Sequence, residues 1–296
     1  MTRSENLPQF VRDLLSSPPH RGGGLNNWFY RVARVLHPFR GANEIIELLK
    51  AATADEPVKH GEIERAVERS KATAWQPGQS AATTQIISPW PKVNKEKRAA
   101  IARTGGGLCD LWECSPVRLE DNKSHTEEII DRLFPNWSTL LCAGRSNQDF
   151  KTRSRMEWRG ELSKLALIVP NPMVARSGKT QDGRESAHAL SITGPRRFLV
   201  IEQDQGTEDE QAAVLLHLAQ IGPIAVAVHS GSKSIHGWFY CVGRPEEKLR
   251  KFMEYAVSLG ADPATWTRSQ FVRMPDGTRE NGNRQVVYFF HPETIK

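Results

Sequence analysis

A run of four apolar residues, Phe198-Leu-Val-Ile201, constrains the fold of this chain more than any other feature. A half-exposed strand alternates apolar and polar side chains, so an uninterrupted apolar run predicts a buried strand, here over residues 197–204. A helix is expected to follow at about 208–220, because Thr207 and Glu210 have the spacing of a capping box. This succession opens the most regular part of the sequence.

The rest of that region continues to alternate strands with helices. A strand at 224–229 is followed by a tight turn at 230–233, which leads directly into another strand at 234–241. Pro245 and Gly260 mark the start and the stop of a helix. Helices between strands, together with one direct hairpin, predict a mixed sheet in an α/β or α+β domain. Further elements are expected as strands at 138–142, 165–169, 271–274 and 285–290 and as a helix at 128–135.

The sequence divides into four segments that differ in composition. Residues 1–24 contain a short helical piece followed by prolines and glycines, which predicts a flexible lead-in. Apolar residues at three- and four-residue spacing predict three helices, a small bundle, within residues 25–75. Residues 76–107 are polar and rich in proline and glycine, which favours a linker carrying a short basic helix. Residues 108–296 then form the main domain.

The charge balance favours a polyanionic partner without deciding for one. The net charge is +6 over 296 residues, which raises the expectation of nucleic-acid binding. No apolar run approaches the roughly 20 residues that span a bilayer, so no membrane partner is expected. The first residues include no apolar segment typical of a secretion signal, which predicts a cytoplasmic protein.

The cysteines do not indicate a zinc site. Cys109 and Cys114 have a C-x4-C spacing with His125 and Cys142 downstream, whereas structural zinc sites usually show more closely paired ligands. We therefore expect reduced, mostly buried thiols, and zinc is not among the expected cofactors.

Two carboxylates follow the apolar run. Side chains two apart on a strand point the same way, so Glu202 and Asp204 are expected on one face at the end of the strand. A lone pair of this kind is often only a solvated strand end. Here the strand is buried and the acids emerge at its rim, where two like charges favour a divalent cation such as Mg²⁺ or Mn²⁺.

A second group of residues is suited to binding a phosphate. Ser234 and His236 share one face of the strand 234–241, and the preceding turn offers backbone N–H groups and the cation of Lys233. His236 alone would more often be a satisfied, half-buried histidine. Carboxylates together with a phosphate-binding strand nevertheless indicate metal-dependent nucleotide chemistry.

Three residues nearer the C-terminus complete the candidate site. A two-metal nucleotidyl transferase usually needs one more carboxylate, for which Asp262 is the candidate. An Asp before a proline is also a common turn residue. Arg268 and Arg273 are candidates for binding a triphosphate, and the alternative for both is an ordinary surface cation.

From about residue 120 onward, the chain resembles the archaeo-eukaryotic primase superfamily, the primase-polymerases of replicons, viruses and mobile elements. That family has a strand ending in two acids, then S-x-H, then an apolar residue with Asp, and often R-x-P-G. The corresponding residues are Glu202-Gln-Asp204, Ser234-Ile-His236, Ala261-Asp262 and Arg273-Met-Pro-Asp-Gly277. Two departures are the order of the acids, with Glu first, and the inserted Asp276. The segment 25–75 is similar to the small primase C-terminal domain often attached to such enzymes.

The resemblance implies a DNA primase, a primer-extending polymerase, or both, with an RNA-recognition-like catalytic half. Nucleoside triphosphates would be joined on a single-stranded DNA template and primer, and a separate helicase would do the unwinding. Glu202, Asp204 and Asp262 would hold two Mg²⁺ or Mn²⁺ ions. The triphosphate ligands would be Lys233, Ser234, His236 and Arg273, with Arg268 as a further candidate.

Two other functional classes stay open at this point. The inverted order of the acids is compatible with a catalytically inactive nucleic-acid-binding replication module on the same fold. A metal-dependent nuclease would use the same acids but would not need the residues that bind a triphosphate.

Overall fold

The computed structural model describes residues 7–16, 18–19, 24–74, 90–180 and 183–295 and divides the chain into two compact units, Met1–Trp90 and Pro91–Lys296. Each unit has its own apolar core. Residues 76–89 of the expected linker, and most of the expected lead-in outside its helix, lie outside the described residues.

The first unit is a helical bundle, as predicted. Its described helices are α1 (Gln9–Leu15), α2 (Leu25–Leu36), α3 (Ala42–Ala52) and α4 (Glu62–Ser70), and the 3-10 turn Lys71–Thr73 follows α4. The three helices expected within 25–75 are confirmed. Each has apolar residues on one face, and these residues are buried in the core of the unit. The core also includes Leu7 and Val11, so the helical piece at the start of the chain packs against this bundle.

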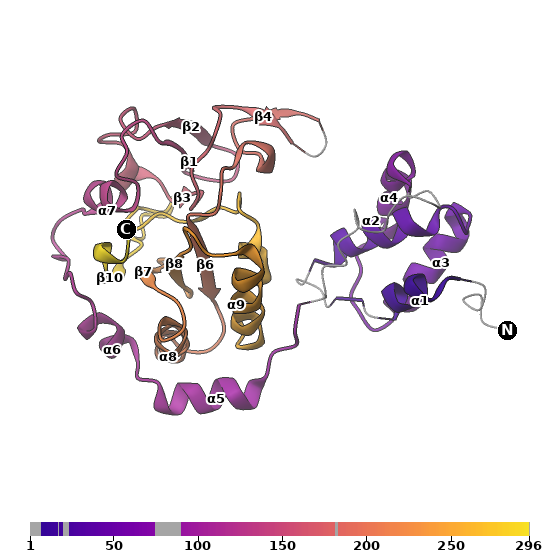
Figure 1. The fold of residues 1–296 in the computed structure, drawn as a ribbon, viewed down its shortest axis with the longest axis horizontal. Coiled ribbons are helices and arrows are strands. Elements are labelled where there is room, and N and C mark those ends of the chain that lie inside the picture. Colours follow the sequence, from indigo (N-terminus) through magenta and orange to yellow (C-terminus); the bar gives the residue numbers. More distant parts are fainter. Residues whose placement is uncertain (1–6, 17, 20–23, 75–89, 181–182, 296) are drawn as a thin grey trace. The chain divides into compact units, whose positions relative to one another are not determined.

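The second unit contains two four-stranded sheets (Figure 1). The first sheet has the strand order β2-β1-β3-β9 and the second has the order β10-β7-β8-β6. The strands of the first sheet are β1 (Leu140–Gly144), β2 (Phe150–Ser154), β3 (Leu167–Ile168) and β9 (Val272–Arg273). Those of the second are β6 (Phe198–Gln203), β7 (Ile224–His229), β8 (Ile235–Tyr240) and β10 (Val287–Phe290). A small ribbon pairs β4 (Gly178–Lys179) with β5 (Glu185–Ser186).

The pairing of the strands differs from the expected mixed sheet. All pairs between the described strands are antiparallel. The helix α8 (Glu208–Ala219) returns the chain so that β6 and β7 run in the same direction, but β8 pairs with both of them. β8 therefore lies between β6 and β7, which run in the same direction. Among the described residues, no two neighbouring strands are parallel.

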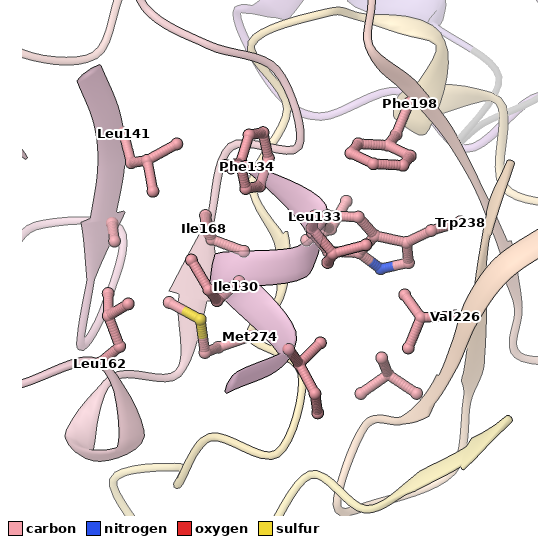
Figure 2. Packing of buried hydrophobic residues seen from close by; sticks show 14 of the residues in the cluster. Ile130, Leu133, Phe134, Leu141, Leu162, Ile168, Phe198, Val226, Trp238 and Met274 are labelled. Atoms are coloured by element: carbon pink, nitrogen blue, oxygen red, sulfur yellow. The ribbon is translucent and has the colours of Figure 1, made fainter. Parts of the chain in front are cut away.

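The main core lies between the two sheets and contains the helix α7 (Thr126–Leu133). Figure 2 shows Ile130 and Leu133 of this helix between Leu141 of β1 and Trp238 of β8. Phe198 of β6 meets Trp238 edge to face, with the ring centroids 5.6 Å apart. One continuous core thus joins both sheets through a single helix.

Helices cover the opposite face of the second sheet. Leu215 of α8 packs directly on Gly237, where a Cβ atom would lie 2.8 Å from the leucine side chain. Phe252 of α9 (Glu246–Ser258) meets Phe239 edge to face at 5.0 Å. Thr207 and Glu210 form the expected capping box of α8. The apolar run of β6 is therefore buried on both faces, as its sequence predicts.

Two short helices precede α7 in this unit. They are α5 (Lys95–Thr104) and α6 (Leu108–Glu113), and both pack on α8. The sequence predicts α5 as a basic helix within a linker, whereas here it belongs to the second unit, because Arg98 and Ile101 are buried. Among the described helices, none is long and apolar enough to cross a bilayer.

Candidate active site

The strand pair β6 and β8 brings the first two sequence motifs together. In their antiparallel register Glu202 lies opposite His236, and Gln203 lies opposite Ile235. Glu202 therefore sits one residue before the end of β6, and Asp204 follows directly after the strand. The predicted juxtaposition of the acids with the Ser-x-His motif follows from this register.

Asp262 reaches the same place through its backbone. Its N–H donates to the carbonyl oxygen of Glu202 at 3.1 Å, and the preceding Ala261 forms an isolated bridge with Gln203. Gly260, with a φ of +96°, ends the helical region and turns the chain toward β6. The carboxylate of Asp262 also caps the short helix at Pro263–Trp266 by accepting from the N–H of Ala264 at 2.9 Å. Asp262 is thus both a turn residue and a neighbour of Glu202.

The carboxyl group of Glu202 is in an unfavourable electrostatic setting. Its pKa is raised, first by burial and then by the negative charges of Asp262 and Asp204. Arg273 and a hydrogen bond with Ser234 oppose this rise in the pKa. A carboxylate whose charge is penalised by its acidic neighbours is stabilised by any cation that binds between them.

His236 is buried and uncharged. Its Nε2 lies 3.2 Å from the Oγ of Ser234 and 3.5 Å from Oε1 of Glu202. Burial, and then the charges of Arg273 and His229, lower the pKa of His236 to about 3. The contact with Glu202 is therefore made by a neutral ring and is not an ion pair. His236 can offer a hydrogen bond to a phosphate but no positive charge.

The turn between β7 and β8 places a cation next to the acids. Nζ of Lys233 lies 3.3 Å from Oδ2 of Asp204, and both side chains are exposed enough to exchange this contact for a ligand. The expected cradle of free backbone N–H groups is not supported. The N–H groups of Lys233 and Ser234 donate to the Oγ of Ser230, and that of Gly231 donates to Nδ1 of His229.

Arg273 comes to the site from the other sheet. It is on β9, opposite Leu167 of β3. Burial, followed by the nearby charge of Arg279, lowers the pKa of its guanidinium, while Glu202 raises it. The site thus lies where the first sheet supplies a cation and the second sheet supplies the acids.

Arg268 is not brought into this group by any contact among the described residues. Its Nη1 donates to the carbonyl oxygen of Gly194 at 3.1 Å, and its own carbonyl oxygen accepts from Asn171. The remaining candidates, Glu202, Asp204, Asp262, Lys233, Ser234, His236 and Arg273, are linked by the pairings and charges described above.

Asp276 is a structural residue. It has a φ of +57°, and its carboxylate accepts from the N–H of His125 and from Nε of Arg284, both at 2.6 Å. Its backbone oxygen accepts from the hydroxyl of Thr126. Asp276 therefore attaches the segment after Arg273 to the start of α7.

Sequence reasoning missed several residues that support the site. Gln211 of α8 is fully buried; its Oε1 accepts from the N–H of Ile235 at 3.0 Å and its Nε2 donates to the oxygen of Lys233 at 2.9 Å. Arg279 donates to the oxygen of Ser230 at 3.1 Å and so fixes the turn. The alternating strand and helix patterns give no signal for these contacts, which join residues far apart in the sequence.

The donor atoms suit a hard divalent cation. Three carboxylates on backbone-paired segments supply only oxygen ligands, as Mg²⁺ and Mn²⁺ prefer. Among the described residues, however, no three His, Cys, Asp or Glu side chains are already grouped to hold a metal ion. Asp204 is engaged with Lys233 and Asp262 with the N–H of Ala264.

Comparison with known proteins gives no match, whether with protein-family models, with curated proteins or with solved structures.

Proposed function

We propose that this chain is a template-dependent nucleotidyl transferase of the archaeo-eukaryotic primase type, which makes or extends primers on single-stranded DNA. The observation that carries this proposal is the meeting of Glu202, Asp262 and Arg273. The two acids are joined by a backbone hydrogen bond, and a half-buried arginine from the opposite sheet interacts electrostatically with Glu202.

The order of the elements supports an RNA-recognition-like fold for the part of the second unit that carries the acids. From β6 to Asp262 the chain runs strand, helix, strand, strand, helix, and then pairs along the free side of β6 through Ala261. This is the succession of a β-α-β-β-α-β unit, with the last strand reduced to one bridge. β8 lies between β6 and β7, and the acids leave the sheet at the end of β6. We infer that this is the RNA-recognition-like half, with β10 added at its β7 edge.

The acidic and the basic residues of the site would have different roles. Glu202, Asp204 and Asp262 would hold two Mg²⁺ or Mn²⁺ ions, which when bound would activate a 3′-hydroxyl and stabilise negative charge on the phosphates. Arg273 and Lys233 supply the positive charge for the triphosphate. Ser234 and neutral His236 orient the carboxylate of Glu202 and can donate hydrogen bonds. Catalysis would then consist mainly of positioning and electrostatic stabilisation.

Two observations favour the alternative of a catalytically inactive nucleic-acid-binding module. The three carboxylates are not grouped for a metal, and the expected phosphate cradle at residues 230–233 is closed by its own hydrogen bonds. Such a module would keep a basic surface for a strand of DNA while losing the need for a cation.

The deciding experiment is primer synthesis on single-stranded DNA with labelled ribo- or deoxyribonucleoside triphosphates and Mg²⁺ or Mn²⁺. We expect products from the wild type and none from the double variant Glu202→Ala, Asp204→Ala. Glu247→Gln, an exposed change on α9, is the matched control and should leave the yield unchanged.

Each rival predicts a different result in that assay. The absence of products, with equal DNA binding by the wild type and the double variant, would favour the binding module. Shortening of labelled DNA by the wild type without added nucleotides would favour a nuclease. Tight binding of a nucleoside triphosphate that is lost on changing Arg273→Met would argue against the nuclease.

A further inference from the structure

Arg98 is a buried arginine on an otherwise exposed basic helix. It lies on α5, where Lys95, Lys97 and Arg103 are exposed, whereas only 9% of the surface of Arg98 is accessible. A charge of this kind stays buried only where hydrogen bonds replace its water. The contacts of the Arg98 side chain therefore indicate which part of the second unit this helix supports.

The guanidinium of Arg98 binds two segments of the chain at once. Its Nη1 donates to Oε1 of Gln203 at 2.7 Å and to the carbonyl oxygen of Leu259 at 2.5 Å. Its Nη2 donates to the carbonyl oxygen of Gln205 at 2.5 Å. All three acceptors are neutral groups, and all lie near the proposed metal ligands in the sequence.

These acceptors flank the acids of the site. Gln203 and Gln205 are the residues on either side of Asp204, and Leu259 precedes Asp262 by three residues. One planar group with several donors therefore fixes the loop after β6 and the turn after α9 in a single arrangement. Burial lowers the pKa of the Arg98 guanidinium, while the negative charges of Glu210 and then of Asp204 raise it.

The local sequence leaves room for this side chain. At Gly260 a Cβ atom would lie 2.9 Å from Nη1 of Arg98, whereas at Gly206 it would first meet the carboxylate of Glu210 and would lie at an ordinary contact distance, 3.4 Å, from Nη2. Both glycines also have a positive φ. The turn at Gly260 thus approaches the guanidinium so closely that a side chain there would collide with it.

We propose that Arg98 is a positioning residue, which holds the loop 203–206 and the turn 259–262 at a fixed separation and so presets the spacing of Glu202, Asp204 and Asp262. The role of those acids rests on the proposed function. The clamp, by which we mean the hydrogen bonds from Arg98 that hold the two segments together, does not depend on it. Arg98 acts through its hydrogen-bond partners and contacts neither substrate nor metal.

The test compares Arg98→Met and Arg98→Lys with the matched control Arg103→Met in the full chain. Amide hydrogen exchange is measured for the segments 203–206 and 259–262, and Mn²⁺ affinity is measured from the electron paramagnetic resonance signal of the free ion. We expect faster exchange confined to those segments in Arg98→Met. We also expect Mn²⁺ binding to weaken about 10- to 100-fold, as is usual when a group that orients metal ligands is lost.

The conservative variant sharpens the test. A lysine offers one ammonium group and cannot bind both segments in the same geometry, so Arg98→Lys should lie between the wild type and Arg98→Met in both measurements. It also carries the test if Arg98→Met does not fold. Arg103→Met should match the wild type, because Arg103 is exposed on the same helix.

Several results would overturn the inference. Unchanged exchange in both segments would do so, and so would a uniform rise in exchange across the whole second unit, which would mark Arg98 as a residue of general stability. If exchange becomes faster only in the two segments while the Mn²⁺ affinity stays unchanged, Arg98 holds the segments together but does not set the spacing of the acids. That result would refute the second part of the inference. If the wild type binds no Mn²⁺, the proposed function fails, and hydrogen exchange alone decides the clamp.

Discussion

The ion pair between Asp276 and Arg284 allows burial to be separated from distance as a source of stability. Its Oδ1–Nε distance is 2.6 Å, and the exposed pair of Glu247 and Lys251 is almost as short at 2.8 Å. The side chain of Asp276 is 2% exposed and that of Arg284 35%, whereas both members of the other pair are more than 70% exposed. Exposed pairs contribute little because water competes for each charge.

We expect Asp276→Asn to lower the free energy of unfolding of the second unit by about 2–3 kcal/mol. Breaking a fully buried pair costs about 3–5 kcal/mol, and the partial exposure of Arg284 lets water recover part of that loss. An asparagine tolerates the positive φ, but its amide oxygen can serve only one of the two donors, His125 N–H or Arg284 Nε. The NH₂ group then faces the other donor.

The assay is urea unfolding of the full chain, followed by tryptophan fluorescence and circular dichroism. Only the transition of the unit Pro91–Lys296 should move, so that the transition of the helical unit serves as an internal reference. Glu247→Gln should have no measurable effect. A loss below about 1 kcal/mol in Asp276→Asn, or an equal loss in Glu247→Gln, would refute the reasoning that burial decides.

Three further predictions concern backbone strain, protonation and thiol reactivity. Gly243→Ala, at a φ of +76° with open space around it, should cost about 1–2 kcal/mol in urea unfolding. Gly260→Ala should cost more, because its Cβ also meets a guanidinium; equal costs would contradict this. His236 has a pKa lowered to about 3, so the unfolded chain binds the extra proton first as the pH falls below about 6.5. Metal-free wild type should therefore lose up to about 1.4 kcal/mol of stability per pH unit relative to His236→Gln between pH 6 and 4, and parallel pH profiles would contradict this. Burial raises the thiol pKa to about 11 for Cys142 and about 12 for Cys241, so at pH 8 a thiol reagent should modify only the two exposed cysteines until the protein is unfolded.

Local patterns in the sequence predict the elements that carry the acids. The apolar run gives β6, the capping box gives the start of α8, and the short turn gives the hairpin of β7 and β8. Each of these signals lies within a few neighbouring residues, so one chain is enough to read it. The meeting of Glu202 with His236 then follows from the alternation of side chains and the pairing of their strands.

The supports of the site could not be predicted in the same way. Arg98 looks like the other cations of its helix, and its partners Gln203 and Leu259 lie 105 and 161 residues further along the chain. Nothing in a local pattern distinguishes a buried arginine from a solvated one. Likewise, two apolar strands give no sign that a third will pair between them, so the expected mixed sheet was wrong.

The helix between the two sheets has a consequence for how this protein can vary. Arg273 belongs to one sheet and Glu202 to the other, while Ile130 and Leu133 of α7 fill the space between the sheets. Interiors pack densely, so a larger or smaller side chain on α7 shifts the sheets slightly with respect to each other. The distance between Arg273 and Glu202 therefore depends on the volume of the apolar side chains of α7. Substitutions in this core that leave the fold intact should still retune the site, and changes on α7 should be accompanied by changes near Arg273.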